Sequence, residues 1–285
     1  MNNVNAIEVK HIYKSFESFS LEDITFDLPK GCIMGLIGEN GAGKSTTIAL
    51  ITDSLKKESG EIMVLGCDNE DPKFEQMKED IGVVLDEAYF PVNMTAAAVN
   101  QMMKYTYKNW NEKVFDDYIH QFNLPRKVQF KQFSRGMKMK LAIAVALSHN
   151  PKLLILDEAT SGLDPIVRDE ILDIFNDFTR DPEHSILISS HILSDLEKLC
   201  DYVTFIHEGK MLFCEEKDAL QEKYGILRCS NAQLDDIPKE AIYGKKESSY
   251  GVECLIDRNL VSSAFTVERA GIEDIILHMV KGGRR

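Results

Sequence analysis

Gly38-Glu39-Asn40-Gly41-Ala42-Gly43-Lys44-Ser45 is the stretch that decides the fold of this chain. It follows the pattern of a phosphate-binding loop, in which two glycines flank four residues and precede a lysine and a hydroxyl. The glycines let backbone N–H groups turn inward around an anion, and the start of a helix adds positive potential. Lys44 is then placed to reach the β- and γ-phosphates of a nucleotide, and Ser45 to bind Mg²⁺. A glycine-rich turn without a ligand is the alternative, which the matching context on both sides disfavours.

The flanking segments predict a strand, this turn and a helix in that order. Cys32–Ile37 is a compact apolar run, and Lys44–Leu55 has helical spacing of its apolar residues. Alternating apolar and polar residues upstream, from residue 6 onward, predict further strands. Short strands are also expected at Glu61–Leu65 and Ile81–Leu85.

A helical insert is expected from about Met94 to Phe133. The window 86–133 holds 10 of the 24 aromatic residues of the chain. A small helical subdomain could use these residues to fill its own core, or they could form a docking face, where aromatic residues are enriched. The residues alone favour the first interpretation.

Beyond the insert, apolar strands alternate with helical segments, which predicts a parallel sheet flanked by helices. These segments are Leu153–Leu156, Pro165–Thr179, Ser185–Ile188, Ile192–Leu199 and Tyr202–Ile206.

The regular alternation ends near Cys214. Short strands are expected between residues 225 and 258, and Ile272–Val280 has the pattern of a terminal helix. We therefore expect one domain over residues 1–214, with a helical subdomain at about 87–135, and an accessory region over residues 215–285.

Two acids end one of the predicted strands. A buried strand would deliver Asp157 to the carboxyl edge of the sheet beside the phosphate loop, where it can hold Mg²⁺. Glu158 would then lie near the γ-phosphate, in position to orient or deprotonate a water molecule. Two acids after a strand are usually a solvated turn or a helix cap, but a phosphate loop in the same chain favours the catalytic interpretation.

A further candidate site precedes the helix that begins near residue 135. Ser134 is a suitable helix N-cap. Arg135, Lys138 and Lys140 place three cations near the helix start, against the preference of the helix dipole, which is reasonable if an anion binds there. A capped core helix with a basic edge is the alternative. His191 could reach a phosphate from the sheet edge, although a lone histidine is usually structural.

Taken in order, these motifs resemble the ATPase subunit of an ABC transporter over about residues 5–214. The resemblance implies an α/β fold: a P-loop NTPase core of the ABC-ATPase type, with a RecA-like mixed sheet that begins with antiparallel strands and carries a helical insert. A small C-terminal α+β accessory region would follow. ATP and Mg²⁺ are the implied cofactors, bound by the loop from Gly38 to Thr46.

The resemblance also assigns roles to single residues. Asp157 matches the Walker B aspartate, Glu158 the catalytic glutamate, Asp164 the D-loop aspartate and His191 the switch histidine at the γ-phosphate.

Three further positions match parts of the family's dimeric ATP site. Ser134 and Gly136 match the signature segment, which in the family closes over ATP held by the opposite subunit of a dimer. Phe16 falls where the family places an aromatic ring against adenine, with a core phenylalanine at a strand end as the alternative.

The chain departs from the family pattern at three positions. Arg135 and Met137 stand where the signature usually has Gly and Gln, so Arg135 could add a charge-assisted phosphate contact. Asp86 stands where the family has a Mg²⁺-linked Gln, and an aspartate could still face the metal or its water. With the tail from Thr266 to Ile275, these departures look most similar to ATPases of Gram-positive exporters of antimicrobial or amphipathic peptides, such as phenol-soluble modulin exporters.

Composition argues against a nucleic-acid-binding protein and against a chain that spans a membrane. The net charge is −13, which disfavours a nucleic-acid partner. No apolar run approaches the length of a membrane helix, the N-terminus lacks a secretory signal and the six cysteines are scattered, so we expect a cytoplasmic protein.

The expected function follows from the resemblance. We expect a dimer of ATPase subunits, homo- or heterodimeric, on the inner face of the membrane, powering a separate permease. The alternatives are a soluble ABC-type ATPase acting on DNA or ribosomes, which the single short cassette and acidic charge disfavour, and a regulatory module not coupled to transport.

Overall fold

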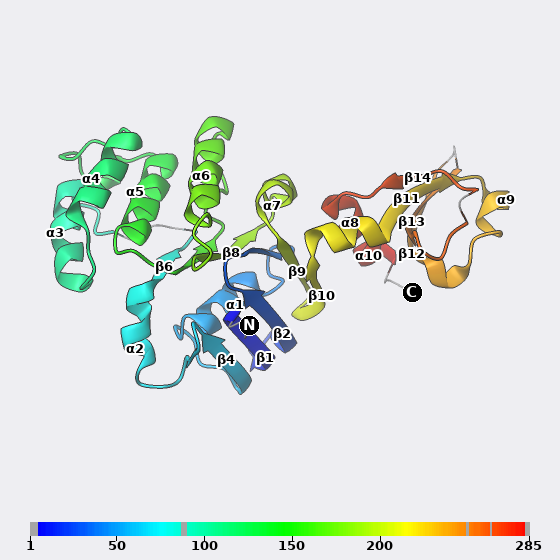
Figure 1. The fold of residues 1–285 in the computed structure, drawn as a ribbon, viewed down its shortest axis with the longest axis horizontal. Coiled ribbons are helices and arrows are strands. Elements are labelled where there is room, and N and C mark those ends of the chain that lie inside the picture. The colour runs from blue at the N-terminus through cyan, green and yellow to red at the C-terminus, as the bar shows by residue number, and fades with distance from the viewer. Residues whose placement is uncertain (1–4, 87–89, 249–250, 263, 283–285) are drawn as a thin grey trace.

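The computed structural model describes residues 5–86, 90–248, 251–262 and 264–282. They form a sheet of ten strands and a second sheet of four strands. The strands of the large sheet are β1 Asn5–Ser15, β2 Ser20–Pro29, β3 Ile33–Ile37, β4 Ser59–Val64, β5 Cys67–Asp68, β6 Ile81–Val84, β7 Leu153–Asp157, β8 Ser185–Ser190, β9 Tyr202–His207 and β10 Lys210–Glu216. Their spatial order is β5-β4-β1-β2-β10-β9-β3-β8-β7-β6 (Figure 1).

Helices of the same part of the chain lie beside this sheet or in an insert at one end of the molecule (Figure 1). They are α1 Lys44–Ile51, α2 Phe74–Met77, α3 Ala96–Thr106, α4 Glu112–Gln121, α5 Arg135–Leu147, α6 Pro165–Phe178 and α7 Leu193–Leu199, with 3₁₀ turns η1 Lys78–Asp80 and η2 Phe130–Gln132.

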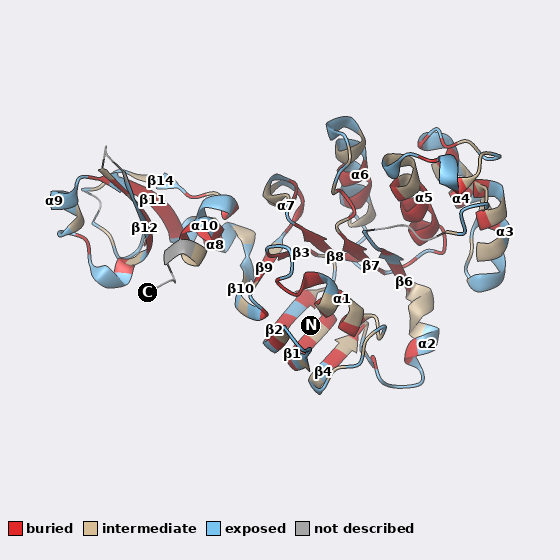
Figure 2. Ribbon diagram, turned by 180° about the vertical axis from the view of Figure 1, so that it is seen from behind, coloured by how far each residue is buried: buried red, intermediate tan, exposed pale blue. Residues whose placement is uncertain are grey.

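The centre of the sheet is parallel. β3 pairs with β8 and β9, and β7 pairs with β6 and β8, all in parallel register. Every residue of β3, β7 and β8 is buried, as expected for strands covered on both faces (Figure 2). The carboxyl ends of these strands share one edge, which brings together the glycine-rich loop, Glu158 and His191.

The other half of the sheet is antiparallel. β1 pairs with β2 and β4, and β10 forms a hairpin with β9. A single parallel pair, Lys210 with Glu22, joins the two halves. The expected mixed sheet with antiparallel strands at its start is confirmed.

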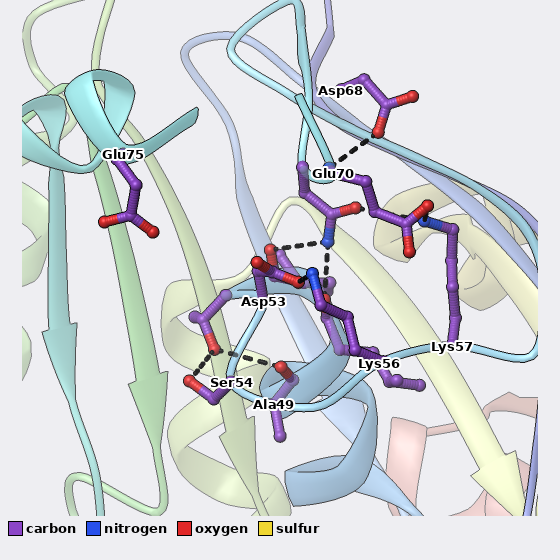
Figure 3. Close-up of polar contacts among 12 residues, drawn as sticks. Ala49, Asp53, Ser54, Lys56, Lys57, Asp68, Glu70 and Glu75 are labelled. Carbon is purple, nitrogen blue, oxygen red and sulfur yellow. Dashed lines mark hydrogen bonds and ion pairs between the residues drawn. The ribbon is translucent and has the colours of Figure 1, made fainter. Parts of the chain in front are cut away.

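Helix α1 ends four residues before the predicted Leu55. Asn69, which is buried, donates from Nδ2 to the carbonyls of Leu50 (2.7 Å) and Ile51 (3.3 Å). Asp53 has a positive φ of 56°. The end of α1 is therefore set by a residue 18 positions further along the chain, and ion pairs of Lys56 and Lys57 surround it (Figure 3).

The insert carrying α3, α4 and α5 is a helical subdomain at one end of the molecule (Figure 1). Most of its aromatic rings are core residues, with Phe115, Phe122, Phe130 and Phe133 all buried. Tyr105 is 86% exposed and does not belong to this core. Most of these aromatic residues therefore fill the core of the helical subdomain, as the first of the two interpretations predicts. The expected range 87–135 begins with residues 87–89, which lie outside the described residues.

A second unit follows β10 and projects from the opposite end of the molecule (Figure 1). Its elements are α8 Lys217–Lys223, β11 Tyr224–Cys229, α9 Asn231–Leu234, η3 Lys239–Ala241, β12 Ile242–Ser248, β13 Gly251–Asp257, β14 Val267–Arg269 and α10 Ile272–Gly282. The strands form an antiparallel sheet in the order β12-β13-β11-β14.

The two faces of this second sheet belong to different cores. Leu227, Val252 and Ile256 pack in a small core of the unit itself. On the other face, residues of the unit join the same core as Leu196 and Leu199 of α7; they are Leu220, Tyr224, Ile226, Leu255, Ile272 and Ile275. Glu197 makes one of the polar contacts at this junction: its Oε1 accepts the N–H of Ile272 at 2.6 Å and so caps α10.

Two global features agree with the sequence expectations. All six cysteines are free. Burial raises the pKa of the Cys200 thiol, and it raises the pKa of the Cys254 thiol to about 11. Both thiols are therefore protonated at neutral pH. No helix in the described part of the chain is long and apolar enough to span a membrane.

Candidate functional site

The glycine-rich loop connects β3 to α1 at the carboxyl edge of the sheet. Gly43 has φ +116°, and a Cβ at this position would lie 2.4 Å from Cδ2 of Leu21, so the loop requires glycine here. The carbonyl of Gly43 then accepts both the N–H and the hydroxyl of Thr47, which starts the helix. The first helical residue is Lys44.

Lys44 is 5% exposed and its ammonium is surrounded by oxygen atoms. Nζ donates to the carbonyls of Gly38 (2.8 Å) and Glu39 (3.3 Å), and lies 3.5 Å from Oε1 of Glu158. A buried cation needs such partners, because burial without them is costly. The loop therefore holds Lys44 facing the carboxylate that follows β7.

Glu158 lies between two basic side chains. Its Oε2 is 2.7 Å from Nδ1 of His191, while Oε1 faces Lys44. Since a carboxylate only accepts, Nδ1 of His191 carries the hydrogen of this bond. Glu158 also has φ +51°, a region that a non-glycine residue rarely adopts and that is common at functional sites.

Ser189 links both acids through one hydroxyl, and the sequence motifs do not identify it. Its Oγ donates to Oδ1 of Asp157 and accepts the N–H of Glu158 at 3.1 Å. Asp157 is 6% exposed, so this bond holds a buried carboxylate in place. The available signal was the pair Ser189-Ser190 at the end of an apolar strand, just before His191.

A cavity of about 550 Å³ lies over the loop and is lined by most of the predicted residues of the loop itself. Its walls are formed by Ser18, Phe19, Asn40, Gly41, Gly43, Lys44, Ser45, Thr46, Asp86 and Glu158. Gly38 contributes its carbonyl to Lys44, and Ala42 is buried behind the loop.

A second hollow, of about 650 Å³, continues from the first and shares Ser18, Phe19 and Gly41 with it. Phe16 lines this hollow, is 46% exposed and stacks on Phe19 with ring centroids 6.3 Å apart. The ring is therefore a surface group, not a core residue, and suits stacking on a base. Together the two hollows could hold the phosphates and the base of one nucleotide.

Ser134, Gly136 and Asp164 form a separate group. Ser134 caps α5 by accepting the N–H of Met137 at 3.2 Å, and Asp164 caps α6 by accepting that of Val167 at 3.1 Å. Neither residue is among the side chains that line the two hollows in the described structure. A Cβ at Gly136 would lie 3.9 Å from Val167, so the starts of the two helices are neighbours.

The three cations near the start of α5 have different partners. Arg135 donates to Oδ1 of Asp86 at 2.8 Å, Lys138 lies over the ring of Phe130, and Lys140 pairs with Glu170 at 2.7 Å. The two lysines thus have partners within the chain, and an anion at this helix start stays a prediction. Arg135 is the one that faces the nucleotide cavity through Asp86.

The donor set fits Mg²⁺. Ser45, Asp86 and Asp157 offer only oxygen atoms, which Mg²⁺ prefers, and Mg²⁺ usually binds through few protein ligands, substrate phosphates and water. Among the described residues, no group of three or more His, Cys, Asp or Glu side chains could hold a metal alone.

Comparison with known proteins gives consistent results. The family described as ABC transporter matches residues 21–161. A lantibiotic transport ATP-binding protein, SrtF of Streptococcus pyogenes, is 37% identical over 218 residues, covering 74% of this chain and 91% of the relative. The bacitracin transport ATP-binding protein BcrA of Bacillus licheniformis is 36% identical over 68% of this chain and 63% of its own length. A solved ATP-binding subunit of an ABC transporter superposes with a TM-score of 0.70 at 28% identity, over 76% of this chain and 92% of that one.

Proposed function

The chain belongs to the ABC transporter family as an ATP-binding subunit that hydrolyses ATP, and on this premise we propose how its residues carry out and use that hydrolysis. The observation that supports the assignment best is the carboxylate of Glu158, which contacts both Lys44 and His191 at the nucleotide cavity. A general base, a phosphate-binding cation and a proton-carrying imidazole meet there within hydrogen-bond or ion-pair distance.

In this proposal the phosphate chain of ATP lies along the loop from Gly38 to Thr46, with adenine on Phe16. Lys44 turns from the loop carbonyls to the terminal phosphates. Glu158 then loses one of its two partners and becomes available to orient and deprotonate the attacking water. His191 keeps the carboxylate oriented and faces the γ-phosphate. Mg²⁺, bound through Ser45, Asp157 and Asp86, would neutralise charge on the phosphates.

The second group of residues, Ser134, Gly136 and Asp164, would act across a dimer. These helix starts lie outside the two hollows, and helix N-termini favour anions. We propose that they close over ATP held by a second ATPase subunit. The ATPase domain would comprise residues 1–214 and the accessory region residues 215–285.

A separate membrane permease is the proposed partner. Apolar side chains are exposed at the sheet edge formed by β6 and in the insert that follows: Val83 is 40%, Leu85 44%, Val92 60% and Tyr105 86% exposed. Val83 and Leu85 lie just before Asp86 in the chain, so closure around ATP could move a permease segment that docks there. Through it the subunit would be peripheral to the inner face of the membrane.

The proposed cargo is a peptide or another amphipathic antimicrobial compound, carried outward. The names of the lantibiotic and bacitracin transport relatives support this class. Reconstitution with the permease that co-purifies from solubilised membranes tests it: ATP hydrolysis should rise with a lantibiotic-type peptide and not with a hydrophilic peptide of equal length.

Replacing Glu158 with Gln tests the catalytic assignment. The amide keeps the size of the side chain but cannot accept a proton, so phosphate release should fall by about 10²- to 10⁴-fold. Nucleotide affinity, measured by calorimetry, should stay within a few-fold of the parental value, and ATP should shift the variant to a dimer in size-exclusion chromatography.

Glu170→Gln is the matched control, because Glu170 is a half-exposed glutamate of α6 that pairs with Lys140 outside the cavity. It should hydrolyse ATP at the parental rate. Parental turnover by Glu158→Gln would show that another group activates the water.

A further inference from the structure

Asp86 and Arg135 form an ion pair across 49 positions of the chain. Nη2 of Arg135 donates to Oδ1 of Asp86 at 2.8 Å, and both side chains are about half exposed. They are also two of the positions at which the sequence departs from the pattern of its family. The two charged side chains that depart from the family pattern therefore pair with each other, and their charges cancel.

The guanidinium of Arg135 also lies against the turn that follows Glu158. Gly162 in this turn has φ +67°, and a Cβ there would be 2.7 Å from Nη1 of Arg135. A larger residue would push the guanidinium away. Arg135, the first residue of α5, thus lies against two other segments: Asp86, just after β6, and the turn between Glu158 and Asp164.

Asp86 faces the nucleotide cavity on its other side. It lines the same cavity as Lys44, Ser45 and Glu158. Its carboxylate can therefore bind either a cation inside the cavity or the guanidinium of Arg135 outside it. Ion pairs between half-exposed side chains are weak, so a divalent cation held by phosphates can compete with Arg135 for this charge.

We propose that the carboxylate of Asp86 is shared between Arg135 and the Mg²⁺ that accompanies the nucleotide, so that binding of Mg·nucleotide releases Arg135. Arg135 is then a positioning residue, which sets how available Asp86 is to the metal. The released guanidinium stands beside Ser134 at the start of α5, where it is suited to bidentate binding of a phosphate. This inference rests on the proposed nucleotide site.

The coupling between Arg135 and the metal must be reciprocal. If Mg·nucleotide breaks the pair, then removing Arg135 in advance should strengthen Mg·nucleotide binding. Removal should leave binding of the metal-free nucleotide unchanged, because that ligand does not need Asp86. This difference between the two ligands separates the proposal from a general effect of charge on an anion site, which would weaken both.

Calorimetric titration of the full chain with ADP, with and without Mg²⁺, tests the proposal without any turnover. Arg135→Gln should bind Mg·ADP about two- to fivefold more tightly than the parent and bind metal-free ADP equally well. Asp86→Asn should weaken Mg·ADP binding alone. In the Asp86→Asn background, Arg135→Gln should have no further effect.

Arg126→Gln is the matched control, since Arg126 forms a comparably exposed pair with Asp116 within the helical subdomain. It should leave both affinities at the parental values. Equal changes with and without Mg²⁺, or additive effects in the double variant, would overturn the shared-carboxylate proposal. Absence of ADP binding in the parent under both conditions would instead overturn the nucleotide site itself.

Discussion

At the scale of single residues, one hydroxyl orients two acids with different tasks. The Oγ of Ser189 donates to the side chain of Asp157 and accepts from the backbone of Glu158. Glu158 needs this support because its positive φ costs about 1–3 kcal/mol. A single bond network therefore couples the position of the proposed metal ligand to that of the proposed base.

Ser189→Ala should lower kcat by about 10- to 100-fold, since misplacing a catalytic group by 1 Å can cost about that much. The free energy of unfolding should fall by only about 1–3 kcal/mol, because one buried acceptor loses its donor. Steady-state phosphate release and urea unfolding measure the two effects.

Ser190→Ala provides the comparison for this prediction. Ser190 is equally buried on the same strand but accepts the N–H of Ile192, away from the two acids. If both alanine variants lower kcat alike, the effect belongs to strand β8 as a whole and not to the hydroxyl of Ser189.

The sequence predicts those site residues whose chemistry is contained in a local motif. Lys44, Asp157 and Glu158 are recognisable because the residues next to them in the chain form a loop or a strand end that is typical of one kind of site. Ser189 is not recognisable in this way, because serine at a strand end has many uses and its two bonds reach 31 and 32 residues back. The partner of Arg135 is hidden for the same reason.

At the scale of elements, α1 is a helix whose end is fixed from outside. Only eight residues long, it carries Lys44 in its first turn and ends where the amide of Asn69 binds its last carbonyls (Figure 3). Buried carbonyls at a helix end need such donors. The position of Lys44 therefore depends on Asn69, which lies after β4.

Asn69→Ala should lower the free energy of unfolding by about 1–3 kcal/mol, because the carbonyl of Ile51 loses its side-chain donor and that of Leu50 keeps the N–H of Asp53 as a donor. Glu75→Gln, an exposed residue of α2, should change stability by less than about 1 kcal/mol, since it weakens only the surface pair with Lys78. Urea unfolding followed by circular dichroism compares the two. If the two variants have the same free energy of unfolding, water must supply the hydrogen bonds to the carbonyls at the end of α1.

Element types follow from the sequence where burial is complete or where buried and exposed positions alternate, as in β1 and β2, and fail where neither pattern is present. The fully buried strands β3, β7 and β8 appear as continuous apolar runs. Strand β10 does not, because its residues are only exposed or half-buried. The predicted extension of α1 to Leu55 fails because apolar spacing continues after the hydrogen bonds of the helix have stopped.

At the scale of the whole molecule, α7 joins the site to the C-terminal unit. The helix follows His191 directly, its Leu196 and Leu199 pack in one core with Ile272 and Ile275, and Glu197 caps α10. The second sheet is thus attached through buried contacts. The sequence pattern places a boundary near Cys214 but does not reveal this shared core, because the contacts join segments about 75 residues apart.

Glu197→Ala should lower the free energy of unfolding by about 1–2 kcal/mol, as for other lost helix caps. Both units should still unfold in one transition, because the shared core remains. Fluorescence of Trp110, in the helical subdomain, and far-ultraviolet circular dichroism should report the same midpoint in urea.

Glu273→Ala removes an exposed acid from the first turn of the same helix and should cost less than about 1 kcal/mol. Two separate transitions in either variant or in the parent would contradict a common core and show that the units fold independently.

A very short strand forms each edge of the ten-stranded sheet. β5 has two residues and β6 has four, so each edge offers few unpaired N–H and C=O groups. Long flat edges allow sheets of different molecules to join and aggregate. The molecule can therefore keep the exposed apolar side chains beside β6 for a specific partner without inviting strand-to-strand polymerisation at that edge.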